Sequence, residues 1–440
     1  MSFTILGSNA TLSARAGLVA VTQLMRSCAQ LPQVLDTQFP VTCGFSDSAV
    51  VHCYVSLLCQ GITDFDAVEN MRRDASFGYA LKLPLLPSAP TLRQRIQQRA
   101  TDWLPCLFES NARLLLRAKV LPSALACGHV PLDIDTFVMD NSDSKKEGVS
   151  CTYMKVDGYA PIAAYLGNEG YLLELALREG SQHSAKETPY TLERVLPLAR
   201  QLTAAFILLR MDSGFDSAVL YEALKRHRAE IGKLDWIVKW NPRRQDLNAI
   251  LAARNAEAST VWNELRPGKK ATVWRETLTD GSFRVLRLTV KDMDRDGQKL
   301  LFPELRLDGW NTTLERCDAE IITLYQGHGT HEQFHSELKT DMGLERLPSG
   351  KFAANDAICA MAMLAYNALR IIGQTGLTGE DSPVKHDADR RRIKTVIREM
   401  IAIPGQWIKH ARQVILSIPQ AWAGFVAFSR MMTSFNALPS

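Results

Sequence analysis

The segment "FILLRMDSGFDSAVLYEALKRHRAEIGKLDWIVKW", from Phe206 to Trp240, carries the pattern that decides the fold class. It begins with an apolar run that predicts a buried strand, and this strand ends on Asp212. A helix is predicted over 216–232, followed by a second strand over 234–240. Strand, helix and strand in succession are typical of an α/β protein.

The segments before Phe206 extend the same pattern towards the N-terminus. The stretch 129–140, "HVPLDIDTFVMD", predicts a strand, and 158–180 predicts two strands joined by a turn at 167–170. A helix with apolar residues at helical spacing follows over 188–205. Three strands, a helix, a strand, a helix and a strand describe an α/β core with a mixed sheet.

Changes in the predicted secondary structure along the chain divide it into regions. These are a helical region (1–128), an α/β core in two parts (129–240 and 319–375), a β-rich insertion between them (241–318) and a helical C-terminal region (376–440).

Single segments within these regions carry their own predictions. The insertion should contain a hairpin that turns at Asp280 and Gly281, a favourable turn dipeptide. One helix is predicted from about Asp318 to Asp341, and the apolar stretch 353–373 predicts a buried helix. A basic cluster, "RRRIK", occupies 390–394.

Bulk composition restricts the class of protein without identifying it. The 440 residues are 46% hydrophobic and 22% charged, which is typical of a globular protein, and the net charge of +4 permits but does not demonstrate nucleic-acid binding. The nine cysteines include no C-x-x-C pair, so reduced thiols and a cytoplasmic location are expected. The start of the chain does not resemble a secretory signal, and the apolar runs are too short or too charged to predict a membrane span.

Two predicted strands end in aspartates, which suggests a functional edge of the sheet. Asp133 and Asp135 follow the first strand on one face, because side chains alternate along a strand, and Asp212 ends the strand 206–211. Ligands of open α/β sheets bind beyond the carboxyl ends of strands. Taken singly, each aspartate is better explained as a turn or helix-capping residue, the commonest role for an aspartate after a strand.

The stretch "HGTHEQFHSELK", from His328 to Lys339, permits two interpretations. As H-E-x-x-H it would place His331 and His335 on one helical face as zinc ligands of a metallopeptidase, with Glu332 as general base. With Tyr325 included, it also spells Y-x2-H-x3-E-x6-K, in which Glu332 is a metal ligand.

Helical geometry favours the second interpretation. At 100° per residue, the four residues Tyr325, His328, Glu332 and Lys339 fall within a sector of about 80°. Together with two strand-end aspartates, Glu332 could hold two Mg²⁺ ions about 4 Å apart, an arrangement suited to phosphodiester chemistry. The peptidase interpretation leaves Asp135 and Asp212 unexplained.

This set of motifs resembles the DDE transposases of bacterial insertion sequences, in the group 1 branch with the signature Y-x2-R-x3-E-x6-K. The matching residues are Asp135 in "DIDT", Asp212 in "RMDSGF", and Tyr325, His328, Glu332 and Lys339. The resemblance extends over about 45–375 and includes "PSAPTLRQR" and "LPSGKFAANDAICAMAMLAYNALR".

The resemblance implies an RNase-H-like core in which Asp135, Asp212 and Glu332 are catalytic and bind two Mg²⁺ or Mn²⁺ ions. Tyr325, His328 and Lys339 would contact DNA. The expected partners are double-stranded DNA, namely the terminal inverted repeats of an element and its target, and a second copy of the chain in the synaptic complex. Such a protein would work at the bacterial nucleoid.

One departure concerns His328, which stands where the family signature has arginine. An arginine is always charged and can grip a phosphate with two hydrogen bonds, whereas a histidine is only partly charged near neutrality. A relative that binds DNA with weakened catalysis is therefore the alternative function. Asp135, rather than Asp133, is chosen as first ligand because it is followed by threonine, as in the family.

A short basic helix is predicted at 88–99, "SAPTLRQRIQQR", with Thr91 as its N-cap. Arg93, Arg95 and Arg99 on its surface suit the recognition helix of a helix-turn-helix motif. The alternative is an ordinary solvated basic face.

Overall fold

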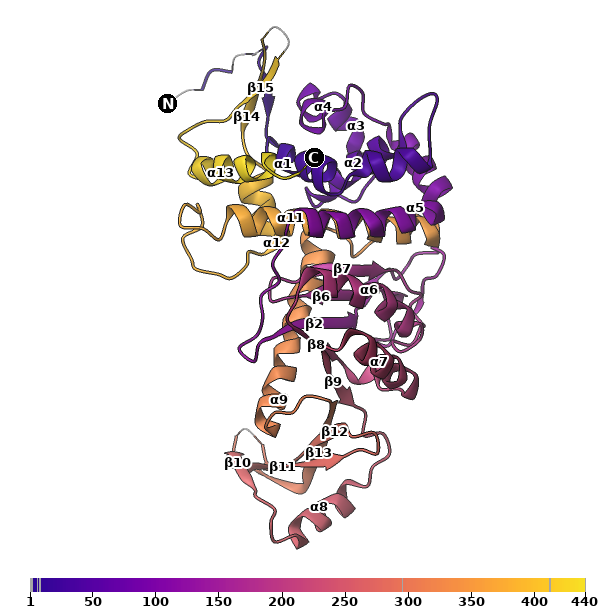
Figure 1. Ribbon diagram of the computed structural model, residues 1–440, viewed down its shortest axis with the longest axis vertical. Helices are drawn as coiled ribbons and strands as arrows, with labels where there is room; N and C mark the ends of the chain where they lie inside the picture. The colour runs from indigo at the N-terminus through magenta and orange to yellow at the C-terminus, as the bar shows by residue number, and fades with distance from the viewer. Residues whose placement is uncertain (1–2, 6, 8, 295, 411–412, 440) are drawn as a thin grey trace. The chain divides into compact units, whose positions relative to one another are not determined.

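The computed structural model describes residues 3–5, 7, 9–294, 296–410 and 413–439 (Figure 1). Its contacts divide the chain into two units. The first unit comprises 1–123, 136–182 and 332–440, and the second comprises 124–135 and 183–331.

The second unit is built on seven strands in the order β10-β11-β12-β13-β9-β8-β2. The strands are β2 (His129–Thr136), β8 (Phe206–Met211), β9 (Leu234–Trp240), β10 (Asn263–Arg266), β11 (Lys269–Thr277), β12 (Phe283–Met293) and β13 (Lys299–Thr312). The β2, β8 and β9 strands are parallel, whereas the pairs β9–β13, β13–β12, β12–β11 and β11–β10 are antiparallel. The predicted α/β fold with a mixed sheet is therefore confirmed.

Helices connect and cover these strands. They are α6 (Thr188–Leu202), α7 (Ala218–Ile231), α8 (Leu247–Ala256) and α9 (Asp318–Gln326), with short 3-10 turns η3 (Ser213–Phe215) and η4 (Gly327–Thr330). The α7 helix is preceded by its N-cap Ser217, whose hydroxyl accepts from the Leu220 amide, and is followed by its C-cap Gly232 with positive φ. Strand 206–211, helix 218–231 and strand 234–240 thus lie where the sequence predicts them.

The predicted hairpin is present, and it has one apolar face. β11 and β12 pair across the turn at Asp280 and Gly281. Leu286, Leu288 and Leu307 form a buried cluster against which α8 and three tryptophans pack, namely Trp240, Trp262 and Trp274. These tryptophans belong to the core of this part of the unit.

The first unit is mainly helical. Its helices are α1 (Leu18–Gln23), α2 (Asp47–Leu58), α3 (Ala67–Arg72), α4 (Ala75–Leu81), α5 (Ala89–Arg117), α10 (His331–Ser336, whose first residue belongs to the second unit), α11 (Phe352–Gly376), α12 (Ile393–Val396) and α13 (Phe425–Asn436), with π-helical turns η1 (Leu24–Cys28), η2 (Pro32–Asp36), η5 (Glu337–Asp341) and η6 (Ile397–Ile401). Its strands are β1 (Thr11–Ser13), β3 (Met139–Asp140), β4 (Ser150–Cys151), β5 (Asp157–Tyr159), β6 (Ile162–Leu166), β7 (Tyr171–Ala176), β14 (Gly405–His410) and β15 (Gln413–Ser417).

The α11 helix is the central element of the first unit. By length and composition it could cross a membrane, but 94% of its apolar window is buried in the protein, as expected of a core helix. Two buried asparagines tie this core to β7: Asn367 accepts from the Leu172 amide at 2.9 Å, and both Asn367 and Asn111 donate to the Leu172 carbonyl. The predicted buried helix is confirmed.

Three details differ from prediction. The basic helix is not short: α5 runs from Ala89 to Arg117, and its N-cap is Ser88 rather than Thr91, with Pro90 in the first turn. The tail is not wholly helical, since β14 and β15 pair within it. Finally, the helix expected from Asp318 to Asp341 is interrupted by η4, whose sequence "GHGT" contains two glycines of low helix propensity.

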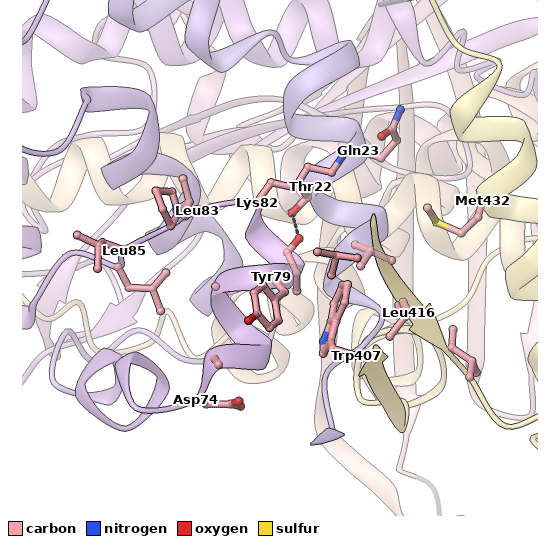
Figure 2. Close-up of a pocket in the computed structure, with 18 of the residues that line it drawn as sticks. Thr22, Gln23, Asp74, Tyr79, Lys82, Leu83, Leu85, Trp407, Leu416 and Met432 are labelled. Atoms are coloured by element: carbon pink, nitrogen blue, oxygen red, sulfur yellow. Dashed lines mark hydrogen bonds between the residues drawn. The ribbon is translucent and has the colours of Figure 1, made fainter. Parts of the chain in front are cut away.

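A cavity of about 1180 Å³ lies within the first unit (Figure 2). Its lining includes Tyr79 of α4, Trp407 of β14, Leu416 of β15 and Met432 of α13. The Tyr79 and Trp407 rings are 5.8 Å apart. Because β14 and β15 were not predicted, neither was this cavity.

Candidate functional site

In the sheet of the second unit, the predicted aspartates lie near the carboxyl ends of two neighbouring parallel strands. Asp133 pairs in register with Arg210, two residues before Asp212, where β2 and β8 run parallel. Asp135 lies two residues after Asp133 on the same face of β2. The expectation that strand ends gather carboxylates is met for Asp133, Asp135 and Asp212.

Asp133 is held in a buried ion cluster. Arg210 donates to it twice, from Nε to Oδ1 at 2.7 Å and from Nη2 to Oδ2 at 2.6 Å, and His328 Nδ1 lies 2.8 Å from Oδ1. Burial by itself would raise the pKa of Asp133, but the charges of Arg210 and His328 outweigh it and lower the pKa to about 2. This carboxylate is ionised and already fully engaged with the protein.

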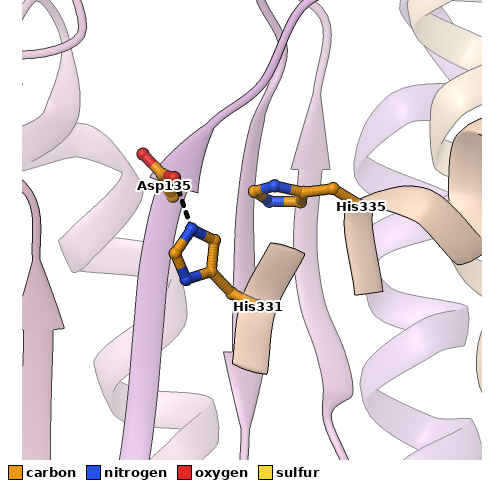
Figure 3. Close-up of side chains that lie close together, drawn as sticks. All are labelled: Asp135, His331 and His335. Atoms are coloured by element: carbon orange, nitrogen blue, oxygen red, sulfur yellow. Dashed lines mark ion pairs between the residues drawn. The ribbon is translucent and has the colours of Figure 1, made fainter. Parts of the chain in front are cut away.

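Asp135 has a different environment. It forms an ion pair with His331, whose Nε2 lies 2.7 Å from Asp135 Oδ2 (Figure 3). Burial lowers the pKa of His331, but its hydrogen bond to Asp135 and the charge of Asp135 raise it more, so the net shift is upward. Asp135 is thus an anionic group that attracts a cation.

Asp212 faces the charge of Asp135. It caps η3, its Oδ1 accepting from the Gly214 amide at 2.8 Å. Burial and the negative charge of Asp135 raise the pKa of Asp212, despite this hydrogen bond. Two carboxylates that disfavour each other's ionisation are a suitable donor set for a hard divalent cation, which would relieve the repulsion.

Aromatic rings pack against one another beside these aspartates. The His328 and His331 rings stack with centroids 4.0 Å apart, and Tyr325 contacts both His328 and Trp310. His328 is only 3% exposed. DNA contacts by Tyr325 and His328 stay predictions, whereas the structure shows His328 acting as a partner of Asp133.

The break in the helix after Gln326 serves this site. Arg210 Nη1 donates to the Leu324 carbonyl at 2.8 Å, one of the carbonyls left without a helical partner at the end of α9. A β-carbon at Gly327 would lie 2.9 Å from this same nitrogen. A glycine at this position therefore leaves room for the arginine that holds Asp133.

Glu332 and Lys339 lie in the first unit. Glu332 is exposed near the start of α10. Lys339 donates to the Val138 carbonyl at 2.9 Å and pairs with Glu345 at 3.1 Å. Their roles as metal ligand and phosphate contact stay predictions. In the same unit the His335 ring stacks on Phe137 with centroids 4.4 Å apart.

The arginines expected to bind DNA have protein partners. Arg95 pairs with the fully buried Asp47, Arg99 lies 3.7 Å from the same carboxylate, and Arg93 lies 3.4 Å from Asp66. DNA binding by these three arginines stays a prediction, and each of them already forms an ion pair within the protein.

The "RRRIK" cluster is also engaged. Arg390 lies 3.7 Å from the buried Glu337, and Arg391 donates to the Leu377 carbonyl at 2.8 Å. Arg392 forms a bidentate ion pair with Asp341. These interactions anchor the C-terminal segment within the first unit.

Sequence reasoning missed Arg210 and the pairing of His331 with Asp135. A signal for Arg210 was present, because an arginine inside the apolar run "ILLRM" must have a buried partner. No comparable signal existed for His331, whose partner is distant in sequence.

Comparison with known proteins identifies the family of the chain. A model of the transposase DDE domain group 1 family matches residues 7–440. Among solved structures, the chain matches a piggyBac transposase synaptic complex with hairpin DNA, with 11% identity, a TM-score of 0.42, and coverage of 87% of this chain and 79% of that one. No curated protein matches it. On the evidence of a family match that spans nearly the whole chain, the protein belongs to the transposase DDE domain group 1 family.

Proposed function

We propose that this protein is a DNA transposase that binds the ends of an element, cleaves phosphodiester bonds there and joins the ends to target DNA. The observation that carries the proposal is the pair Asp135 and Asp212 at one sheet edge, in a chain of the transposase DDE family. Water would attack phosphorus and break its bond to the 3′ oxygen, which leaves a 5′ phosphate and a free 3′ hydroxyl. That hydroxyl would then attack a phosphorus of the target DNA, forming a new phosphodiester bond and releasing a 3′ hydroxyl of the target strand.

Asp135, Asp212 and Glu332 would hold the divalent metal. The two aspartates fit it because their oxygens are hard donors and their charges repel each other, and Glu332 is added from its place in the sequence signature. Magnesium or manganese, when bound, supplies an activated water and stabilises the leaving oxygen. Asp133 is not the first ligand in this proposal, because Arg210 and His328 already occupy both of its oxygens.

The remaining residues position this donor set. The Asp133, Arg210 and His328 cluster fixes the end of β2, and with it the direction of Asp135 two residues later. His331 holds the Asp135 carboxylate through one oxygen. The family match favours this interpretation of "HEQFH" over a zinc peptidase, since it covers the stretch within a transposase domain.

The proposal is tested with Asp212→Asn in the full chain. The amide oxygen can still accept from Gly214, so the turn should be preserved, but the carboxylate charge is lost. We expect DNA binding to remain and strand cleavage in Mg²⁺ or Mn²⁺ to fall by about 10²- to 10³-fold, the scale of losing one transition-state contact.

The matched control is Asp216→Asn on the same loop, where Asp216 accepts from Tyr221 and from the Asn241 amide. Its cleavage rate should stay near that of the wild type. Cleavage by Asp212→Asn at the wild-type rate would contradict the proposed site.

A further inference from the structure

The face of the sheet that carries the aspartates continues into a row of cations. Paired residues on neighbouring strands share a face, and so do residues two apart on one strand. Arg210 pairs with Ile237 of β9, and Lys239, two residues on, pairs with Trp310 of β13. By the same alternation, Asp308 and Arg306 of β13 lie on this face.

The next strands add further cations to the same face. Arg287 of β12 pairs with Asp308, Lys291 with Glu304, and Lys269 of β11 with Lys291. We call the five cations the basic face: Lys239, Lys269, Arg287, Lys291 and Arg306. The opposite side of these strands carries the leucine cluster covered by α8, which leaves the cations on the other side.

One buried carboxylate organises the centre of the basic face. Asp308 is 4% exposed and lies 3.0 Å from Arg306, 3.1 Å from Arg287 and 3.5 Å from Lys239. Burial would raise the pKa of Asp308, but hydrogen bonds from Arg287 and Arg306 keep it below its ordinary value. A single negative charge thus holds three cations in place without neutralising them.

The outer part of the basic face also has excess positive charge. Lys291 pairs with Glu304 at 2.9 Å, and Lys269 lies opposite Lys291 on the neighbouring strand. Five cations against Asp308 and Glu304 leave a net charge of +3. Four of the cations line a hollow of about 250 Å³, namely Lys269, Arg287, Lys291 and Arg306.

The basic face begins beside the candidate site. Met211 pairs with Val238, so Asp212 and Lys239, the next residue on each strand, are about one strand spacing of 4.8 Å apart in the register. Arg287 lies two strands beyond Lys239 and two residues further along, or about 16 Å from Asp212 in the plane of the sheet. This spacing suits an extended row of phosphates that runs away from the carboxylates, rather than one small anion bound in a pocket.

We infer that the basic face binds the phosphate backbone of DNA as it leaves the cleavage site. This inference rests on the proposed function and deepens it by naming the contact surface. DNA is favoured over an acidic protein because the cations share one sheet face with the proposed catalytic aspartates.

The test measures binding of the full chain to a fluorescently labelled DNA duplex as a function of salt. Each lost phosphate contact lowers the slope of log affinity against log salt by about 0.9. For Lys269→Gln with Arg306→Gln we expect a slope lower by about 1.8 units, which makes the affinity loss between 50 and 200 mM salt about tenfold smaller than in the wild type. Arg306 is largely exposed, and Asp308 keeps Arg287 and Lys239, so this variant should fold.

Two controls make the result specific. Lys225→Gln with Arg226→Gln removes the same charge from α7, which lies on the other side of the sheet, where Tyr221 contacts Asn311. Its slope should not change, and Lys269→Arg with Arg306→Lys should keep the wild-type slope. An unchanged slope in the glutamine variant, with the wild type binding DNA, overturns the basic face alone. A wild type that binds no duplex even at low salt overturns the proposed function as well.

Discussion

At the scale of single residues, the Asp133–Arg210 pair sets the geometry of the site. Both residues are 3% exposed, and their side chains are joined by two hydrogen bonds. Removing one partner of a buried ion pair leaves an uncompensated charge. We expect Arg210→Met to lower the free energy of unfolding by about 3–5 kcal/mol, measured by urea denaturation.

The control for this prediction is Arg226→Met, which removes an exposed arginine paired with Glu193. Exposed pairs contribute little, so its cost should stay below about 1 kcal/mol. If both variants lost the same small amount, Asp133 would not depend on Arg210. Combining Arg210→Met with Asp133→Leu should restore part of the stability, because no buried charge then remains unpaired.

At the scale of elements, the turn between α9 and α10 has a specific packing role. Gly327→Ala would place a β-carbon 2.9 Å from Arg210 Nη1, and this nitrogen cannot move freely because its guanidinium holds Asp133 and the Leu324 carbonyl. We expect a loss of about 1–3 kcal/mol in the free energy of unfolding, as for overpacking elsewhere.

Gly329→Ala is the matched control in the same turn, because no described heavy atom lies within 4 Å of its β-carbon position. The alanine restricts the unfolded chain, so this variant should be neutral or more stable by about 0.4–1 kcal/mol. Equal effects at both glycines, measured by urea denaturation, would show that helix propensity rather than contact with Arg210 controls this turn.

The elements that could be predicted are those with a local signal. The strand 206–211, the helix 218–231 and the hairpin at Asp280 and Gly281 all follow from periodicity and turn residues. The strand-end aspartates could be found in the same way. The signature residues Glu332 and Lys339 came from helical spacing together with the family resemblance.

What could not be predicted depends on contacts between distant parts of the chain. Nothing near Arg95 shows that Asp47 will be buried beside it, and nothing near His331 shows that Asp135 will be its partner. The basic face was missed for a related reason. Its cations are dispersed over β11, β12, β13 and β9, and only strand register brings them together. The basic residues at 93–99 and 390–394, by contrast, are close together in the sequence.

At the scale of the whole molecule, acid should destabilise the protein through a residue far from the aspartates in sequence. His52 in α2 is 4% exposed, and its Nε2 lies 3.1 Å from the Thr22 hydroxyl. That hydroxyl donates to the Ala80 carbonyl (Figure 2), so His52 must donate to the Thr22 oxygen. Burial, together with the charge of Arg26, lowers the pKa of His52 to about 3.

The sign of the effect follows from this lowered pKa. An unfolded histidine takes up a proton below pH about 6.5, while folded His52 stays neutral down to about 3, so the unfolded state binds more protons in this range. The contribution of His52 to stability is therefore present above pH 6.5 and is lost as the pH falls towards 3. Between pH 7 and pH 5 this loss is about 2 kcal/mol.

His52→Gln tests this prediction, because its amide can still donate to Thr22 but does not titrate. Urea denaturation of the full chain at pH 7, 6 and 5 should show a smaller acid-induced loss in the variant than in the wild type, by about 2 kcal/mol at pH 5. Carboxylates such as Asp133, with a pKa of about 2, contribute equally in both proteins and mainly below pH 4. If the two proteins lost the same stability between pH 7 and pH 5, His52 would have to accept a proton in the folded state, and the loss would then arise from other titrating groups.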